Sequence, residues 1–413
     1  MSGAERRVVI TGYGTVSALG DEWDSIRNFI QAGKNAVTYM PEWDVYRGMK
    51  TRLAAPVSHF ELPSHYRTRE RNSMGRVAQM AVVATERALA LAGLSHDPVV
   101  KNGQCGIAYG SATGSPDAGE EFFALLNDYS MERINTTTYT RMMSHTAPVN
   151  IGVKFGVTGR MYTTTSACTA GSQGIGYAYE AIKSGIQEVM IAGGAEELNP
   201  TQSAVFDAIM AASRKFNDEP EKSPRPFDKS RDGLVIGEGA TTLILESLDR
   251  AQARGARIYG EIVGFATNMD GAHLVRPKQD TQEAVMRAAL DSAALSPADI
   301  GYVSAHATAT DRGDVIEANG TYNVLGRVPI SAMKSYTGHS LGACGAFELF
   351  GALMMMNEDW FMPTLNLDEI DDECPDLDFI VDKCRPLSVE YCMSNNFAFG
   401  GVNTSIIVKR YQS

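Results

Sequence analysis

The sequence predicts a large α/β fold in which a mostly buried sheet is flanked by helices. Short apolar runs of strand length alternate along the chain with longer segments whose apolar residues recur at three- and four-residue spacing. The chain has 413 residues, 44% of them hydrophobic and 21% charged, so it can bury one large core or two fused ones. Its 39 glycines indicate many tight turns and close backbone approaches. Fibrous and coiled-coil proteins are therefore excluded.

Eight apolar runs are the strand candidates of this sheet. In chain order they are RRVVITGY (6–13), QCGIAYGSA (104–112), EVMIAGGAEE (188–197), TTLILES (241–247), YGEIVGFA (259–266), IGYVSAHA (300–307), RVPISAM (327–333) and TSIIVKR (404–410). Helices are expected between them, at Met74–Gly93, Ser172–Ser184 and Thr281–Ala294. The longest apolar stretch, Leu341–Met356, has 16 residues and contains Glu348, so we expect a buried helix too short to span a bilayer.

A weak internal repeat divides the predicted fold into two halves. The segment RRVVITGYGTVSALG near residue 7 resembles ARIYGEIVGFATNMDG near residue 256, which follows a charged helix expected at Leu248–Arg254. We expect similar halves, residues 1–255 and 256–413, in one packed body because no low-complexity linker separates them. Spacing alone leaves the duplication open, since all βα units resemble one another.

Charge and cysteine content narrow the class of protein. The formal net charge is −12, and residues 357–382 hold ten acidic residues and no basic one, which argues against general nucleic-acid binding. The six cysteines, at 105, 168, 344, 374, 384 and 392, form no C-x-x-C pair and match neither a zinc site nor a disulfide framework. The N-terminus lacks the apolar region that a signal peptide needs. We therefore expect a soluble protein of the reducing cytoplasm.

Cys168 is the first candidate catalytic residue. It lies in MYTTTSACTAGSQGIGYAYEAIKSG (161–185), where a β-branched run turns into a helix with Ile175, Tyr179 and Ile182 on one face. Backbone amides at a helix N-terminus stabilise a thiolate and make the sulfur nucleophilic near neutral pH. A buried structural cysteine is the alternative for an isolated Cys, but the small residues around Cys168 favour a functional turn.

Two histidines and a lysine occupy similar positions in the second half. His306 ends the run GYVSAH, and Lys334 and His339 lie between RVPISAM and the helix that contains Glu348. The carboxyl ends of strands are where α/β sheets gather their sites, although a lone histidine there is more often structural. Metal binding is not expected, because no H-x-x-x-H or C-x-x-C spacing exists. A cysteine hydrolase remains a competitor, but it uses one histidine with an acidic or amide orienter.

A glycine pair marks the C-terminal segment SNNFAFGGVNTS (394–405). Phe397 and Phe399 lie beside Gly400 and Gly401, just before the last predicted strand. The two glycines permit a tight, mobile turn. A plain turn with one aromatic side chain in the core is the alternative.

These segments together resemble the β-ketoacyl-acyl-carrier-protein synthases, the condensing enzymes of fatty acid and polyketide synthesis in the thiolase superfamily. The resemblance extends over essentially the whole chain, through VVITGYGTVSALG, SACTAGSQGIG, IAGGAEE, RPFDKSRDGLVIGEGA, KSYTGHSLGACGAFE and NNFAFGGVNTS. It implies a thiolase-like duplicated α-β-α-β-α sandwich.

The resemblance also implies a role for each candidate residue. The catalytic residues would be Cys168 as nucleophile, His306, His339 and Lys334, with Glu348, Phe399, Gly400 and Gly401 in support. Thr308 and Thr310 would bind the pantetheine arm of the substrate, and Thr113 would lie near the base of the acyl pocket. Alanines at 307, 309 and 398 replace usual glycines, so both loops should be stiffer.

The implied reaction is a two-stage decarboxylative Claisen condensation. An acyl group moves from the phosphopantetheine of acyl carrier protein to Cys168, and malonyl-acyl-carrier protein then loses CO2 and attacks it. No metal, nucleotide or flavin is required. A non-catalytic chain-length-setting subunit would usually lack the nucleophile, and a thiolase-type acyl-CoA enzyme would carry a second cysteine near the C-terminal loop. Acyl preference and the choice between fatty acid and polyene or polyketide pathways stay open.

Two protein partners are expected. The family forms dimers through a strand close to the nucleophile, so Thr163–Ala167 would lie near the seam of a homodimer or of a heterodimer with a related subunit, and 142–145 near the partner's pocket. Acyl carrier proteins are acidic, so a basic patch should dock them. The candidates are Arg67, Arg69, Arg71 and Arg76, a local charge of +3 with Glu70, and the pair Arg214 and Lys215.

Overall fold

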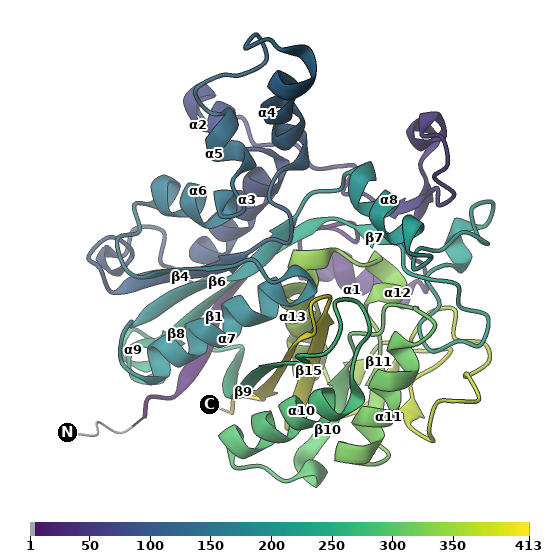
Figure 1. The fold of residues 1–413 in the computed structure, drawn as a ribbon. Helices are drawn as coiled ribbons and strands as arrows, with labels where there is room; N and C mark the ends of the chain where they lie inside the picture. Colours follow the sequence, from purple (N-terminus) through teal and green to yellow (C-terminus); the bar gives the residue numbers. More distant parts are fainter. Residues whose placement is uncertain (1–4, 413) are drawn as a thin grey trace.

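The computed structural model describes residues 5–412, and its centre is a sheet of eleven strands (Figure 1). All eight predicted strands form and belong to this sheet, so those predictions are confirmed. The strands run in the order β13-β11-β10-β15-β16-β9-β1-β8-β6-β4-β5. Their bounds are β1 Val8–Ser17, β4 Cys105–Gly110, β5 Met161–Thr164, β6 Val189–Glu196, β8 Gly239–Ser247, β9 Gly260–Met269, β10 Ile300–Ser304, β11 Pro329–Ser331, β13 Asp378–Phe379, β15 Tyr391–Ala398 and β16 Val402–Lys409.

The strand order repeats between the two halves of the chain. In the first half β1 pairs antiparallel with β8, β8 antiparallel with β6, and β6, β4 and β5 are parallel. In the second half β9, β16, β15, β10 and β11 follow the same order with the same directions. The two half-sheets join where β1 pairs antiparallel with β9. This repeat supports a duplicated fold, while the division at 255/256 stays a prediction.

Helices cover both half-sheets and separate them. The predicted helices are confirmed as α3 (Arg76–Leu91), α7 (Ala170–Lys183) and α10 (Gln279–Ala293). α3 packs on β1 and β8, and α10 packs in the same way on β9 and β16. α7 and α13 (Cys344–Asn357) pack against each other and contact strands of both halves (Figure 1). The layers are therefore helix, sheet, paired helices, sheet and helix, as a duplicated sandwich requires.

Shorter elements complete the fold. The remaining helices are α1 Trp23–Gln31, α2 Thr68–Ser73, α4 Pro116–Asp128, α5 Thr138–Met142, α6 Thr146–Phe155, α8 Pro200–Ala208, α9 Leu248–Ala253, α11 Gly313–Leu325 and α12 Lys334–Thr337. The short strands are β2 Thr38–Tyr39, β3 Leu53–Ala55, β7 Ile236–Gly237, β12 Trp360–Phe361 and β14 Arg385–Pro386, outside the main sheet.

The apolar run 341–356 forms a buried helix, as predicted. It begins as a 3-10 turn, Leu341–Ala343, and continues as α13, of which residues 344–356 are all buried. A helix that is apolar on every side must lie in the middle of a large core. Within residues 5–412 no helix is both long and apolar enough to cross a membrane.

The segment 394–405 contains a strand that the sequence did not predict. β15 is a central strand between β10 and β16, and the predicted glycine turn joins β15 to β16 as a hairpin. The buried Asn395 and Asn396 interrupt the apolar pattern of β15. Periodicity does not identify such a strand because it assigns polar residues to solvent, whereas the amide groups of these two asparagines donate to buried residues distant in the chain.

Candidate active site

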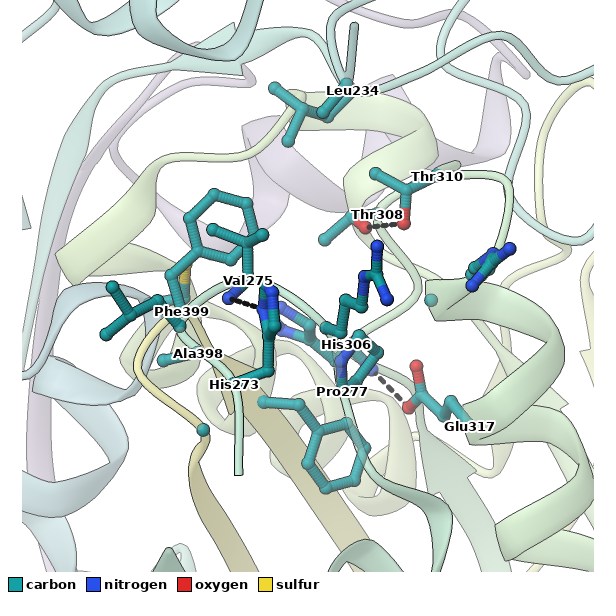
Figure 2. A pocket seen from close by; sticks show the side chains of 18 of the residues that line it. Leu234, His273, Val275, Pro277, His306, Thr308, Thr310, Glu317, Ala398 and Phe399 are labelled. Carbon is teal, nitrogen blue, oxygen red and sulfur yellow. Dashed lines mark hydrogen bonds between the residues drawn. The ribbon is translucent and has the colours of Figure 1, made fainter. Parts of the chain in front are cut away.

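A cavity of about 580 Å³ opens where the two halves of the fold meet (Figure 2). Its lining includes Cys168 from the first half and His306, His339 and Phe399 from the second. Figure 2 shows His306 near the centre, with Thr308 and Thr310 on one side and Ala398 and Phe399 on the other. The structure therefore brings together residues that lie as far as 231 positions apart in the chain, from 168 to 399.

Cys168 lies in a sharp turn at the start of α7, as predicted. The turn is a 3-10 helix, Ala167–Thr169, in which Ala167 has a φ of 50°. A non-glycine residue at positive φ costs about 1–2 kcal/mol, and such strain is common at functional sites. The turn aims the sulfur at the cavity, where the backbone N–H groups of Phe399 and Cys168 both face it. These two amides are the donors expected of an oxyanion site.

His339 is the partner of the Cys168 thiol. Its Nε2 lies 2.9 Å from Cys168 Sγ. Its backbone is fixed by two hydrogen bonds, from His339 N–H to the Val235 carbonyl (2.7 Å) and from Gly237 N–H to the His339 carbonyl (3.0 Å). Burial, followed by the charge of Lys334, holds the pKa of His339 well below 6.5. His339 is therefore neutral at pH 7 and can accept the thiol proton at Nε2.

Burial dominates the protonation of the thiol itself. It raises the pKa of Cys168 to about 12, although Lys334 and the two nearby amides act in the opposite direction. In the substrate-free protein the sulfur is thus a neutral thiol that donates toward His339. The N-terminus of α7 does not by itself keep Cys168 ionised. Activation of the thiol therefore needs transfer of its proton to the His339 imidazole.

Lys334 and Glu348 form a fully buried ion pair behind His306. Lys334 Nζ donates to Glu348 Oε1 and lies 3.1 Å from His306 Nδ1. Burial lowers the pKa of Lys334, but its neighbours, Glu348 among them, raise it overall, so the ammonium stays charged. Burial raises the pKa of the Glu348 carboxyl, and Lys334 and Asn396 counteract it. Asn396 Nδ2 donates to Glu348 Oε2 over 2.7 Å and completes the pair.

The ion pair fixes the tautomer of His306. Both Lys334 Nζ and Asn396 Nδ2, at 3.1 and 3.3 Å, are donors that face His306 Nδ1. Nδ1 must therefore accept, which leaves the proton on Nε2 as a donor. Burial, then Lys334 and His339, hold the pKa of His306 well below 6.5, so the ring is neutral. The rings of His306 and His339 meet edge to face, with centroids 5.2 Å apart.

The loop after His306 is strained at both of its alanines. Ala307 has a φ of 20° and Ala309 a φ of 63°, values that glycine adopts without cost. The buried Glu317 on α11 accepts from the His306 and Ala307 amides, both over 2.7 Å. Burial raises the pKa of Glu317 to about 8. Neither Glu317 nor Asn396 was predicted, since each acts through a residue distant in the chain.

Several of the other predicted residues lie at the cavity, and their roles stay predictions. Thr308 and Thr310 line the cavity, and their hydroxyl oxygens lie 3.0 Å apart. Phe399 lies at its mouth, where Gly400 N–H donates to the Leu274 carbonyl over 2.7 Å. A Cβ on Gly401 would lie 2.6 Å from that of Asp270, so this close approach requires glycine.

Thr113 is not part of this cavity, contrary to the expectation of an acyl-pocket base. Its side chain is exposed in the single chain. Its Oγ1 donates to the buried Glu196 (2.6 Å) and accepts from Gln202 (2.9 Å). The contact with Glu196 determines its position because that carboxylate also holds the Ala112 amide.

The predicted basic patch is smaller than the sequence indicated. Arg71 donates to the Tyr66 and Pro63 carbonyls, Arg76 pairs with Glu238, and Arg214 pairs with Asp207. Arg67, Arg69 and Lys215 remain exposed. None of the predicted docking residues lines the cavity. Glu238 neutralises Arg76, while Arg71 keeps its charge but directs its donors at backbone carbonyls, so fewer arginines are free to bind a partner than the sequence indicated.

Three of the site residues have donor atoms within reach of one metal ion. The ligating atoms of Cys168, His306 and His339 lie within 4.8 Å of one another, as do those of His306, Cys344 and Glu348. Sequence spacing cannot reveal such a set because its members come from different strands. The adjacent Lys334 ammonium opposes a cation at either place. The expectation of no metal stays a prediction.

The fold and the site define an enzyme of the thiolase-like class, with a cysteine and two histidines at the junction of duplicated halves. Family models match along the chain: the N-terminal domain of beta-ketoacyl synthase at residues 5–251 and its C-terminal domain at 259–368. The protein belongs to the β-ketoacyl synthase family.

Individual relatives agree with this assignment. The chain is 35% identical to 3-oxoacyl-[acyl-carrier-protein] synthase 1 of Haemophilus influenzae, with 98% of this chain and 99% of the relative covered. It is 34% identical to synthase 2 of Vibrio harveyi, with 98% and 99% covered. A crystal structure of a beta-ketoacyl synthase from Burkholderia phymatum superposes with a TM-score of 0.97 at 50% identity, covering 98% and 100% of the two chains. The predicted thiolase-like fold is confirmed.

The protonation state of Cys168 can be measured directly. Because its pKa is raised to about 12, the thiolate fraction is small at pH 7 and rises about tenfold per pH unit. We expect iodoacetamide to alkylate Cys168 with a rate that follows this rise from pH 7 to 10, measured by mass spectrometry. Lys334→Met should slow alkylation further, since Lys334 lowers that pKa. A rate independent of pH would show a preformed thiolate–imidazolium pair instead.

Proposed function

We propose that the protein condenses an acyl thioester with malonyl-acyl-carrier protein to give 3-oxoacyl-acyl-carrier protein and CO2, in chain elongation. The observation that carries this proposal is the division of roles between two neutral histidines. His339 Nε2 faces the Cys168 sulfur, whereas His306 has its Nδ1 occupied by Lys334 and keeps Nε2–H as a donor. The names of the relatives identify acyl-carrier-protein thioesters as their substrates.

The first stage transfers the acyl group to Cys168. The thiol gives its proton to His339 as the sulfur attacks the thioester carbonyl. The carbonyl oxygen becomes negative, and the amides of Cys168 and Phe399 stabilise that charge. The departing pantetheine thiolate then takes a proton, which His339 is placed to return.

The second stage uses both histidines as donors. Loss of CO2 from the malonyl group leaves an enolate, whose oxygen accepts from His306 Nε2–H and from His339 Nε2–H. His339 ends the first stage with its proton on Nδ1, so it donates here as its other neutral tautomer, which is open to it because Nδ1 has no hydrogen-bond partner among the described residues. Lys334 keeps His306 in the required tautomer and adds positive charge. The enolate carbon attacks the acyl-enzyme carbonyl, the C–S bond to Cys168 breaks, and the 3-oxoacyl thioester leaves. The Cys168 thiolate then takes a proton from solvent, which restores the thiol for the next cycle.

The alternatives are less well supported. A chain-length-setting subunit does not need the Cys168–His339 contact that this chain retains. A thiolase-type enzyme needs a second cysteine near the C-terminal loop, where this chain has Phe399, Gly400 and Gly401. No step above uses a metal, nucleotide or flavin, so we propose a cofactor-independent enzyme, working in the cytoplasm.

Acyl carrier protein is the proposed donor of both substrates. A type II polyketide acyl-carrier protein in complex with its ketosynthase has a ketosynthase chain that superposes on this one with a TM-score of 0.88, at 29% identity, covering 99% and 100% of the two chains. The cavity that contains Cys168 is also lined by Thr308 and Thr310, whose hydroxyl groups could bind the pantetheine arm.

A homodimer is the proposed assembly. β5 ends the sheet with one edge unpaired within residues 5–412, and such an edge invites pairing with another strand. Around α4 and α5, large apolar side chains are exposed: Phe123, Leu126, Tyr129, Met131 and Tyr139. A Cβ at Gly114 would lie 3.0 Å from the Met143 carbonyl, so Thr113 adjoins this face. A second copy pairing along β5 would cover it.

The dimer is tested by sedimentation velocity at micromolar concentration. We expect a species of twice the chain mass, because a second copy would pair the free edge of β5 and cover exposed apolar side chains. Leu126→Glu with Met131→Glu should convert it to a monomer. Val45→Glu, at a residue equally exposed but far from this face in the chain, is the control and should leave the dimer intact. A monomeric wild type would refute the assembly.

The proposed roles of Cys168, His306 and His339 separate in two assays. After incubation with an acyl donor, mass spectrometry should find an adduct on Cys168, and none in Cys168→Ala. His306→Ala and His339→Ala should each reduce CO2 release from a malonyl thioester by about 10²-fold or more, as for loss of an oxyanion donor. His306→Ala should still accept an acyl group, since Cys168 bonds to His339. An adduct on Cys344 or Cys392, or full decarboxylation in the double variant, would contradict the proposal.

Carrier docking is tested through the exposed part of the basic patch. Arg67→Glu with Arg69→Glu should raise KM for acyl-carrier-protein substrates by about tenfold and leave turnover of a small pantetheine thioester unchanged. Added salt should weaken the wild type in the same direction. Lys383→Glu, an exposed lysine of the second half, is the control. Equal loss with both substrates would place the docking site elsewhere.

A further inference from the structure

Arg231 is a buried arginine that the catalytic steps above do not use. Its side chain is 2% exposed, and it contacts neither Cys168 nor either histidine. Instead its Nε donates to the Thr310 carbonyl (3.1 Å), and its Nη2 donates to the Asp311 carbonyl. Both carbonyls belong to the loop that follows His306.

The other side of Arg231 is fixed to an acidic segment. Its Nη1 donates to the Asp371 carboxylate and, over 3.0 Å, to the Asp228 carbonyl. Asp371 N–H in turn donates to the Phe227 carbonyl over 3.0 Å. The acidic stretch 357–382 therefore helps to fix the Arg231 side chain, through Asp371. It holds a guanidinium whose planar fork binds three carbonyls, of Thr310, Asp311 and Asp228, and one carboxylate.

The His306 loop is held from both ends. At its start Glu317 accepts from the His306 and Ala307 amides. In its middle the Ala309 carbonyl accepts from Gly233 N–H over 3.0 Å. At its end Arg231 binds the Thr310 and Asp311 carbonyls.

The His306 loop needs hydrogen bonds from other segments because its backbone conformation is unfavourable for the alanines in its sequence. Ala307 and Ala309 both lie at positive φ, which disfavours alanine and would relax toward negative φ if the loop were free. Relaxation would move the backbone that carries the His306 ring. His339 has separate anchors at Val235 and Gly237, so it would keep its place beside Cys168.

We propose that Arg231 is a positioning residue that keeps His306 in place for decarboxylation, by holding the Thr310 and Asp311 carbonyls against the strain of the two alanines. The expected effect on decarboxylation rests on the proposed function, whereas the expected effect on the conformation of the His306 loop does not. Because a misplacement of about 1 Å in an active site costs roughly 10²-fold in rate, the second stage depends on Arg231 and the first does not.

Arg225 provides a matched control. It is buried in the same segment and also joins it to the acidic stretch, through Asp228 (3.1 Å) and Asp368. It makes no contact with the His306 loop among its hydrogen bonds to described residues. Arg225→Met and Arg231→Met each remove a buried guanidinium from an acidic partner, so Arg225→Met shows the effect of that loss away from the His306 loop. Only Arg231 also has the buried Asp314 carboxylate as a charge partner, so the comparison uses the ratio of the two reaction rates rather than overall stability.

The test compares both variants with the wild type in three measurements. In Arg231→Met, CO2 release from a malonyl thioester should fall about 10- to 100-fold while acylation of Cys168 stays within about threefold. Hydrogen exchange of the peptide covering residues 305–312 should become faster. Arg225→Met should change neither the ratio of the two rates nor the exchange of that peptide.

Each outcome decides the proposal. Equal loss of acylation and decarboxylation in Arg231→Met, or the same selective loss in Arg225→Met, would overturn it. If Arg231→Met does not fold, Arg231→Lys, which keeps a charge beside Asp371 but cannot span both carbonyls, should show the selective loss in smaller measure. If Arg231→Lys shows no selective loss of decarboxylation, the proposal is also overturned. A wild type that releases no CO2 would refute the proposed function, and unchanged exchange at 305–312 would separately refute the role of Arg231.

Discussion

The buried ammonium of Lys334 is the constraint around which the site is arranged. A charge removed from water must be neutralised and fully hydrogen-bonded, and losing one member of such a pair costs about 3–5 kcal/mol. Glu348 meets this demand from the middle of an otherwise apolar helix, and Asn396 satisfies the second oxygen of the carboxylate. Three residues from three elements are thereby locked together.

The same constraint determines the chemistry of the histidines. Lys334 points a donor at His306, so that ring can only present a proton at its other nitrogen. Its charge also contributes to keeping both imidazoles neutral at physiological pH. Lys334 thus sets the tautomer of His306 and helps to keep the His306 and His339 rings neutral. It also lowers the pKa of the Cys168 thiol, against the larger effect of burial.

Much of this arrangement could be predicted from the sequence, because its strands are apolar and its reactive residues lie where strands end. The predictions failed where a residue is defined by a distant partner. β15 was missed because Asn395 and Asn396 break its apolar pattern. The partners of the Asn396 side chain include Glu348 and His306, 48 and 90 residues away. From the sequence, Arg71 and Arg76 were predicted to be free to bind a partner. In the structure Arg71 donates to backbone carbonyls and Arg76 pairs with Glu238. The resemblance placed Thr113 at the base of the acyl pocket, but in the single chain Thr113 is exposed and does not line the cavity.

The position of β1 has a consequence for how the protein folds. This strand comes first in the chain among the strands of the sheet, yet it lies in the middle of the sheet, and its neighbours are β8 and β9. Val8 pairs with Ser247 and Ile262, so the apolar strand has no partner until most of the first half and the start of the second have been synthesised. Contacts this distant make folding slow and leave an unpaired apolar segment exposed meanwhile. Because β1 joins β8 of the first half to β9 of the second, the two halves complete their sheet only together.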